Sequence, residues 1–277
     1  MKKILVPCDF SSPAEEAFHF AVNLAKKSGG SISLLHAIEM PVLAYGASID
    51  IPVYTFDAEL LAALKEAAIK RFKKLTAKYS KGFDRTQLTV LQGTPFQTIR
   101  EFAVDKKIDL VIMGTHGTSG LHEFFVGSNT EKIVRFSKVP VLVIRKSVSV
   151  SSIKNIVVPV SLGKDQSYFI NKLKDLQIFF DARLHLLYLN TPFDFIRDKE
   201  LEDFAKLHKL SNYTVNIRNE RYELDGIISF TKEVNGDMLA MGTHKRKGLA
   251  HLMQGSITED VVNHATCPIW TSGLKRT

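Results

Sequence analysis

The segment FAVDKKIDLVIMGTHGTSGLHEFFVGSNTEKIVRFSKVP, residues 102–140, decides the fold because a second version of it follows in the same chain. Shifted by 128 residues, it aligns with FTKEVNGDMLAMGTHKRKGLAHLMQGSITEDVVNHATCP, residues 230–268, and 14 of the 39 positions are identical. Self-similarity across so long a distance is the signature of a duplicated unit. The 277-residue chain is therefore expected to contain two related domains.

The opening strands of the two copies repeat as well. KKILVPCDFS, residues 2–11, matches IKNIVVPVSLG, residues 153–163, but at a shift of 152 residues. The first copy therefore carries 24 extra residues before its glycine-rich loop, most of them expected within PVLAYGASIDIPVYTFD, residues 41–57. The serine-rich KSVSVSS, residues 146–152, indicates a linker. The predicted domains are 1–147 and 153–277.

Within each copy, short apolar runs alternate with segments of helical periodicity. DLVIMG (109–114) and PVLVIRK (140–146) are nearly continuous apolar runs, as strands of a parallel sheet buried on both faces require. Residues 58–79 form a long amphipathic helical pattern, and Ser12-Pro13 has the hydroxyl and the proline of a helix start. This alternation predicts an α/β fold with two tandem, doubly wound, open five-stranded parallel-sheet domains of Rossmann-like type.

Composition narrows the function classes. The chain has a formal net charge of +8 and 45% hydrophobic residues, which is typical of a globular protein. No apolar run approaches the roughly 20 residues of a membrane helix, and the apolar stretch before Asp9 is too short for a signal peptide. We expect a cytoplasmic protein without membrane contact. No arginine-rich arm or basic helix indicates nucleic-acid binding.

The two cysteines, Cys8 and Cys267, lie far apart in the sequence and give no disulfide framework, which suits a reducing compartment. Cys8 stands beside Asp9 at the end of the first strand. It is either a redox-sensitive thiol or a small buried apolar side chain, and the second role is the more common one for cysteine at a strand end.

The glycine-rich loop of the first copy follows its fourth strand, where ligands of open α/β sheets bind. Gly114 and Gly117 permit close backbone approach to a ligand, and positive φ where a turn requires it. Gly127 and Ser128 open a helix, whose unpaired N–H groups and dipole favour an anion. Asp9 is placed to accept hydrogen bonds from ribose hydroxyls or an adenine amine. The pattern predicts a nucleotide site, although one such loop alone is also explained by a turn with Ser128 as helix cap.

The spacing Gly114-x2-Gly117-x9-Gly127-Ser128 resembles the G-2x-G-9x-G-S/T motif of the universal stress protein family, in its ATP-binding branch. VPCDFS (6–11), LLHAIE (34–39) and PVLVIRK (140–146) resemble the first, second and last strands of that family. The resemblance covers both halves, so the chain resembles a tandem universal stress protein.

The resemblance implies an ATP site in the first half, with Mg²⁺ or Mn²⁺ accompanying the triphosphate. It places adenine and ribose beside the first strand, the adenine edge against the backbone of the second strand, and ribose and phosphates in the glycine-rich loop. The positions carried over are, in that order, Pro7 and Asp9; Ala37; and Gly114, Thr115, Gly117, Gly120, Gly127, Ser128 and Asn129.

The second copy departs from the motif. Ser161 stands where the first copy has Asp9, and Lys245 replaces Gly117, so a side chain occupies a position where the motif has bare backbone. We expect a degenerate domain that pairs with the first. Family members dimerise through their last strands, and the resemblance implies that a tandem chain makes this contact internally as a pseudo-dimer. A further homodimer stays open.

The leading hypothesis is an adenine-nucleotide-binding stress-response or signalling module that acts on an unknown protein partner. The sequence shows no catalytic residue and no metal-ligand set near the expected phosphates, so we predict that it is not an enzyme. One alternative is a slow ATPase or nucleotidyl-transfer enzyme of the wider nucleotide α-hydrolase-like fold group. The other is an interaction protein that binds no nucleotide.

Overall fold

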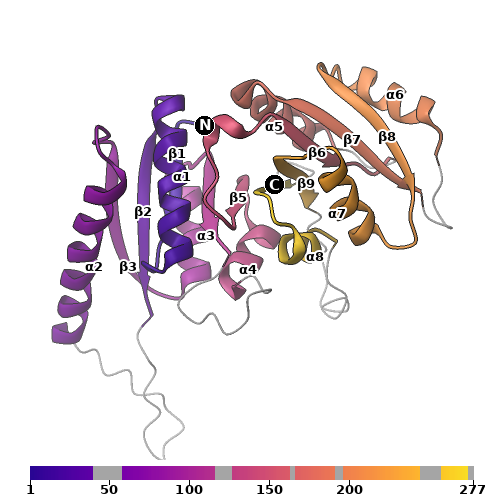
Figure 1. Cartoon of the computed structure of the whole chain (residues 1–277). Coiled ribbons are helices and arrows are strands. Elements are labelled where there is room, and N and C mark those ends of the chain that lie inside the picture. The colour runs from indigo at the N-terminus through magenta and orange to yellow at the C-terminus, as the bar shows by residue number, and fades with distance from the viewer. Residues whose placement is uncertain (40–57, 116–126, 163–165, 191–195, 244–256, 274–277) are drawn as a thin grey trace, which may run out of the picture.

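Figure 1 shows a computed structural model of the chain, which describes residues 1–39, 58–115, 127–162, 166–190, 196–243 and 257–273. The first half comprises β1 (Lys3–Pro7), α1 (Ser12–Ser28), β2 (Ser31–Ile38), α2 (Ala58–Tyr79), β3 (Thr86–Gln92), α3 (Pro95–Asp105), β4 (Leu110–Gly114), α4 (Ser128–Phe136) and β5 (Val141–Ile144). A 3-10 turn, η1 (Val150–Ser152), lies at the end of the expected linker.

The second half repeats this order. It comprises β6 (Asn155–Pro159), α5 (Ser167–Phe180), β7 (Arg183–Asn190), α6 (Asp198–Leu207), β8 (Tyr213–Asn219), α7 (Glu223–Glu233), β9 (Met238–Thr243), α8 (Ile257–His264) and β10 (Ile269–Gly273). The predicted α/β class and the strand–helix alternation of both copies are confirmed. No helix among the described residues is long and apolar enough to cross a membrane.

The ten strands of the described residues belong to one sheet, in the order β3-β2-β1-β4-β5-β10-β9-β6-β7-β8. The strand pairs within each half are parallel. In the first half, the chain adds β2 and β3 on one side of β1 and then β4 and β5 on the other, so the switch point lies between β1 and β4. The halves meet where β5 and β10 pair antiparallel, with Trp270 opposite Leu142 and Ile269 opposite Val143. The two five-stranded parallel sheets are therefore continuous with each other.

Helices cover both faces of this sheet because its strands bury side chains on both sides (Figure 1). Along β1, Ile4 and Val6 join the cluster that packs against α1, α5 and α6, whereas Leu5 joins the cluster that packs against α3, α4, α7 and α8. This alternation follows from the two-residue period of a strand. Because helices cover both faces of the sheet, a ligand is expected at the carboxyl ends of the strands.

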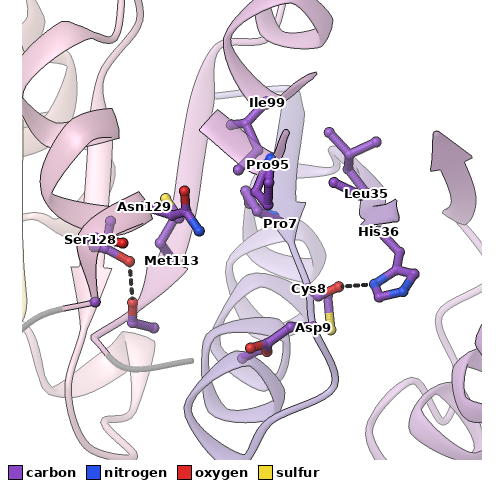
Figure 2. A pocket seen from close by; sticks show the side chains of 15 residues that line it. Pro7, Cys8, Asp9, Leu35, His36, Pro95, Ile99, Met113, Ser128 and Asn129 are labelled. Atoms are coloured by element: carbon purple, nitrogen blue, oxygen red, sulfur yellow. Dashed lines mark hydrogen bonds between the residues drawn. The ribbon is translucent and has the colours of Figure 1, made fainter. Parts of the chain in front are cut away.

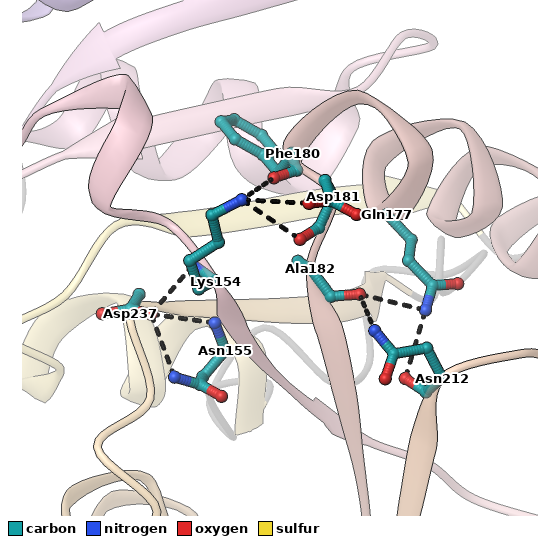
Figure 3. A network of polar contacts seen from close by, with 8 residues as sticks. All are labelled: Lys154, Asn155, Gln177, Phe180, Asp181, Ala182, Asn212 and Asp237. Carbon is teal, nitrogen blue, oxygen red and sulfur yellow. Dashed lines mark hydrogen bonds and ion pairs between the residues drawn. The ribbon is translucent and has the colours of Figure 1, made fainter.

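A polar network fixes the amino ends of the strands in the second half (Figure 3). Asp237, just before β9, accepts hydrogen bonds from the backbone N–H groups of Lys154 (2.9 Å) and Asn155 (2.8 Å), which ties β9 to β6. The ammonium of Lys154 also lies 3.2 Å from the carboxylate of Asp181. In the first half, Asp109 makes the same two bonds to the backbone at the start of β1. The duplicated contact explains why each parallel pair keeps its register.

His185 in β7 is buried with both ring nitrogens in hydrogen bonds. Its Nε2 lies 3.1 Å from Oδ1 of Asn155, and its Nδ1 lies 2.9 Å from Oγ1 of Thr214. Because the amide oxygen can only accept, Nε2 carries the proton and Nδ1 accepts from the threonine hydroxyl. Burial lowers the pKa of His185 below its ordinary value, and the positive charge of Arg183 adds to this shift.

We expect His185 to make the folded state less stable in mild acid. The unfolded chain takes up a proton at the ordinary histidine pKa of about 6.5, whereas the folded chain resists protonation until lower pH. The free energy of unfolding should therefore be highest above about pH 6.5 and fall as the pH drops through the lowered pKa. Urea denaturation of the wild type and His185→Gln between about pH 5 and pH 7 measures this slope. The variant should show a flatter slope, and an unchanged slope would contradict the assignment.

Candidate functional site

A cavity of about 150 Å³ lies at the carboxyl ends of β1, β2 and β4, where α3 and α4 begin (Figure 2). It is at the point where the strand order reverses, the position at which open α/β sheets bind ligands. The residues that line it are Pro7, Cys8, Asp9, Ala14, Leu35, His36, Ala37, Pro95, Ile99, Met113, Gly114, Gly127, Ser128, Asn129 and Thr130.

Most of the residues expected from the sequence come together here. The seven that line the cavity are Pro7, Asp9, Ala37, Gly114, Gly127, Ser128 and Asn129. Thr115 does not line it. It is only 2% exposed, and its carbonyl accepts a hydrogen bond from the backbone N–H of Gly127. Gly117 and Gly120 lie outside the described residues.

Asp9 is held at the edge of the cavity by the turn that leads from β1 into α1. Its Oδ1 accepts hydrogen bonds from the backbone N–H (3.0 Å) and the hydroxyl (2.6 Å) of Ser11. Phe10, between them, has a φ of +61°, a conformation that is rare for a bulky residue. Ser11 is the N-cap of α1, one residue earlier than the sequence indicated, and its hydroxyl binds Asp9 instead of the helix. The turn thus fixes the position of the carboxylate.

The end of β2 supplies His36, which the sequence did not single out as a site residue. Its Nδ1–H donates to the carbonyl oxygen of Cys8 at 2.7 Å, because a carbonyl can only accept. The backbone N–H of Cys8 in turn donates to the carbonyl of Leu35 at 2.9 Å. A histidine within the apolar run SLLHAIE was the available signal, since the other residues of that run suit a buried strand.

Gly114 is required by the packing of the first half. A Cβ there would lie 2.5 Å from the carbonyl oxygen of Pro13 and 2.8 Å from its Cβ, because the end of β4 lies directly against the start of α1. From the sequence, we attributed this glycine to close approach of a ligand or to a positive φ. The contact with Pro13 was not predicted. Gly127 has a φ of −60°, so it does not need the left-handed region either.

The helix α4 begins at the cavity. Gly127 is its N-cap and Ser128 its first residue, so the alternative role of Ser128 as helix cap is wrong. The hydroxyl of Thr130 donates to the carbonyl of Gly114 at 2.9 Å, which anchors the first turn of α4 to the end of β4. The unpaired N–H groups of that turn provide donors for an anion. Neither lysine nor arginine occurs among the described lining residues.

Burial suppresses the reactivity of Cys8. Its side chain is 5% exposed, and burial raises the pKa of its thiol from 9.0 to about 12. The thiolate is the reactive form. We therefore expect Cys8 to be alkylated by iodoacetamide at least roughly a hundredfold more slowly in the native protein than in urea. Peptide mass spectrometry after timed alkylation distinguishes it from Cys267. Equal rates in the two states would show that the thiol is accessible and would restore the redox-sensor hypothesis.

The second half places bulkier side chains at the corresponding positions. Shifted by 152 residues, Tyr188 corresponds to His36 and Leu189 to Ala37, and Tyr188 is only 3% exposed. The Cδ atoms of Leu189 lie about 3 Å from where a Cβ of Gly226 would be, so Leu189 packs directly against α7. At the position of Ala37, which lines the cavity of the first half, the second half therefore has a larger side chain packed against a helix.

Comparison with known proteins places the chain in a family. The model described as "Universal stress protein family" matches residues 1–145 and 223–272. The chain is 32% identical over 146 residues to universal stress protein MJ0531 of Methanocaldococcus jannaschii, covering 52% of this chain and 82% of that protein. It is 30% identical over 154 residues to universal stress protein MJ0577 of the same organism, covering 52% of this chain and 95% of that protein.

A crystal structure of a universal stress protein from Archaeoglobus fulgidus DSM 4304 shares the fold. It matches 98% of this chain and 96% of its own, with a TM-score of 0.77 and 19% identity. Residues 146–222, which the family model leaves unmatched, contain the first three strands of the second half, where Tyr188 and Leu189 lie. The family model nevertheless spans more than half of the chain in two segments, one in each half, and the chain belongs to the universal stress protein family.

Proposed function

We propose that the first half binds ATP and that the chain is a stress-response or signalling module rather than an enzyme. The observation that carries this proposal is the cavity at the strand switch point, with Asp9 at one side and the first turn of α4 at another. We further propose that residues 1–147 and 153–277 act as two domains, and that nucleotide is held in the first alone.

The chemistry of the lining suits a nucleotide. Leu35, Pro95 and Ile99 give the cavity an apolar wall for the base (Figure 2). Asp9, fixed by Ser11, would accept hydrogen bonds from ribose hydroxyls. The N–H groups at the start of α4 and the hydroxyl of Ser128 would bind the phosphates, whereas the hydroxyl of Thr130 is already bonded to the carbonyl of Gly114. Asp9 and α4 contribute opposite kinds of polar group, acceptor and donor, as ribose and phosphate require.

A Mg²⁺ ion that accompanies the triphosphate would be held mainly by phosphate oxygens and water. The described residues contain no group of three or more histidine, cysteine or carboxylate side chains that would hold a metal ion. The hydroxyl of Ser128, which lines the cavity at the start of α4, is a candidate contact for the ion. We therefore assign the ion to the nucleotide and give the protein no dedicated metal ligand.

Isothermal titration calorimetry with Mg-ATP tests the proposal on the full-length chain. We expect one site per chain and a loss of affinity of about tenfold or more in Asp9→Ala, since a hydrogen bond to a charged group contributes roughly 1.5–3 kcal/mol. Asp9→Asn keeps a side-chain oxygen that can accept the hydrogen bonds from Ser11, so it should lose less ATP affinity than Asp9→Ala.

Two outcomes would replace the proposal. If neither the wild type nor any variant responds to adenine nucleotides, the protein is an interaction module without nucleotide. If the wild type hydrolyses ATP with saturable kinetics that Asp9→Ala abolishes, the enzyme alternative holds.

A further inference from the structure

The two halves contact each other across α4 and α8 as well as through β5 and β10, and two arginines of the first half make side-chain contacts with α8. Arg145, directly after β5, donates through Nη2 to the carbonyl oxygens of Val262 (3.0 Å) and Asn263 (2.6 Å) in the last turn of α8. Arg135, in the last turn of α4, has its Nε 3.5 Å from Oε1 of Glu259 in the first turn of α8. The first half therefore supplies a guanidinium to each end of α8.

Both contacts satisfy a chemical need of α8. The last carbonyl groups of a helix have no partner within the helix, and a cation near them interacts favourably with the helix dipole. The side chain of Glu259 is only 7% exposed, and a carboxylate removed from water requires a compensating charge. The arginines meet these needs from the other half of the chain.

Because the two halves are related, the residues at corresponding positions show whether each half could make the same contacts. Shifted by 128 residues, Arg135 corresponds to Asn263 and Arg145 to Gly273, so the second half lacks both arginines. The residue that corresponds to Glu259 is Glu131, so the first half presents the cations and a carboxylate together. The complementarity between the two halves is therefore one-sided in this chain.

We infer that the α8–β10 face of the second half accepts only a partner half that presents arginines at the positions of Arg135 and Arg145. Two second halves placed against each other would bury two copies of Glu259 without either guanidinium. In this chain the partner is the first half, and β5–β10 pairing is continuous with the arginine contacts. None of the residues in these contacts lines the cavity of the first half.

Trp270 reports on this interface. It is the only tryptophan of the chain, lies in β10 opposite Leu142 of β5, and is 2% exposed. Thermal unfolding of the full-length protein followed by tryptophan fluorescence therefore monitors the junction of the halves. The variants are Arg135→Gln, Glu259→Gln and their combination, with Lys132→Gln on the exposed side of α4 as a control of equal charge change.

We expect Arg135→Gln to lower the melting midpoint by several degrees more than Lys132→Gln. Adding Glu259→Gln should restore part of the loss, because the carboxylate that needs the cation is then gone. The exchanged pair Arg135→Glu with Glu259→Arg should likewise be more stable than Arg135→Glu alone. Additive effects of Arg135→Gln and Glu259→Gln, or no difference between Arg135→Gln and Lys132→Gln, would overturn the inference.

Discussion

Ala37→Leu should abolish measurable ATP binding by the first half while leaving the protein folded. Ala37 lines the cavity at the end of β2, and leucine is the residue that the second half has at the corresponding position. A leucine side chain would occupy space that the adenine base needs in a cavity of about 150 Å³. We expect a loss of affinity of at least about a hundredfold, which is roughly 2.8 kcal/mol, measured by calorimetry with Mg-ATP.

The matched control is Leu189→Ala in the second half. It makes the reciprocal exchange, removes packing against Gly226, and should leave ATP affinity unchanged while lowering the stability of the second half by about 2–5 kcal/mol. Unchanged affinity in Ala37→Leu would mean that the nucleotide does not enter this cavity. Reduced affinity in Leu189→Ala would mean that the second half takes part in binding.

Gly114→Ala should destabilise the protein even without ligand. The added Cβ would lie 2.5 Å from the carbonyl oxygen of Pro13, a backbone atom that cannot move without shifting the start of α1. Overpacking of this kind typically lowers the free energy of unfolding by about 1–3 kcal/mol, or occasionally more. Urea denaturation of the unliganded protein measures the change.

Gly82→Ala separates the steric effect from a general effect of replacing glycine. The position has open space around it and a φ of +73°, so only backbone strain on the order of 1 kcal/mol is expected. Gly114→Ala should therefore be the more destabilising of the two. If it is tolerated as well as an exposed substitution, the contact between β4 and α1 has been misplaced.

Local sequence patterns were sufficient to predict the elements of this fold. Residues 58–79 have an apolar stripe at helical spacing, and the structure has α2 over this range. The apolar runs 109–114 and 140–146 contain β4 and β5. Duplication supported the two strand assignments, because both apolar runs recur in the second half at a shift of 128 residues. The start of α1 was displaced by one residue, to Ser11, and the alternative cap Ser128 by one residue, to Gly127, because capping depends on backbone angles that the sequence does not specify.

The composition of the cavity was less predictable. The resemblance supplied residues of the glycine-rich loop and of the ends of β1 and β2, and it gave no signal for Pro95 and Ile99, which α3 brings to the site. The reason for Gly114 was also hidden, since Pro13 lies about a hundred positions earlier. Contacts between distant segments leave no periodic signature, so they became visible only in the folded chain.

The most direct test of the central claim is to denature freshly purified protein and quantify the released nucleotides by mass spectrometry against the protein concentration. We expect adenine nucleotide at close to one per chain in the wild type and none in Ala37→Leu. Two nucleotides per chain would contradict the assignment of binding to the first half alone. Complete absence of nucleotide, together with no calorimetric response to Mg-ATP, would contradict the claim that this protein binds ATP.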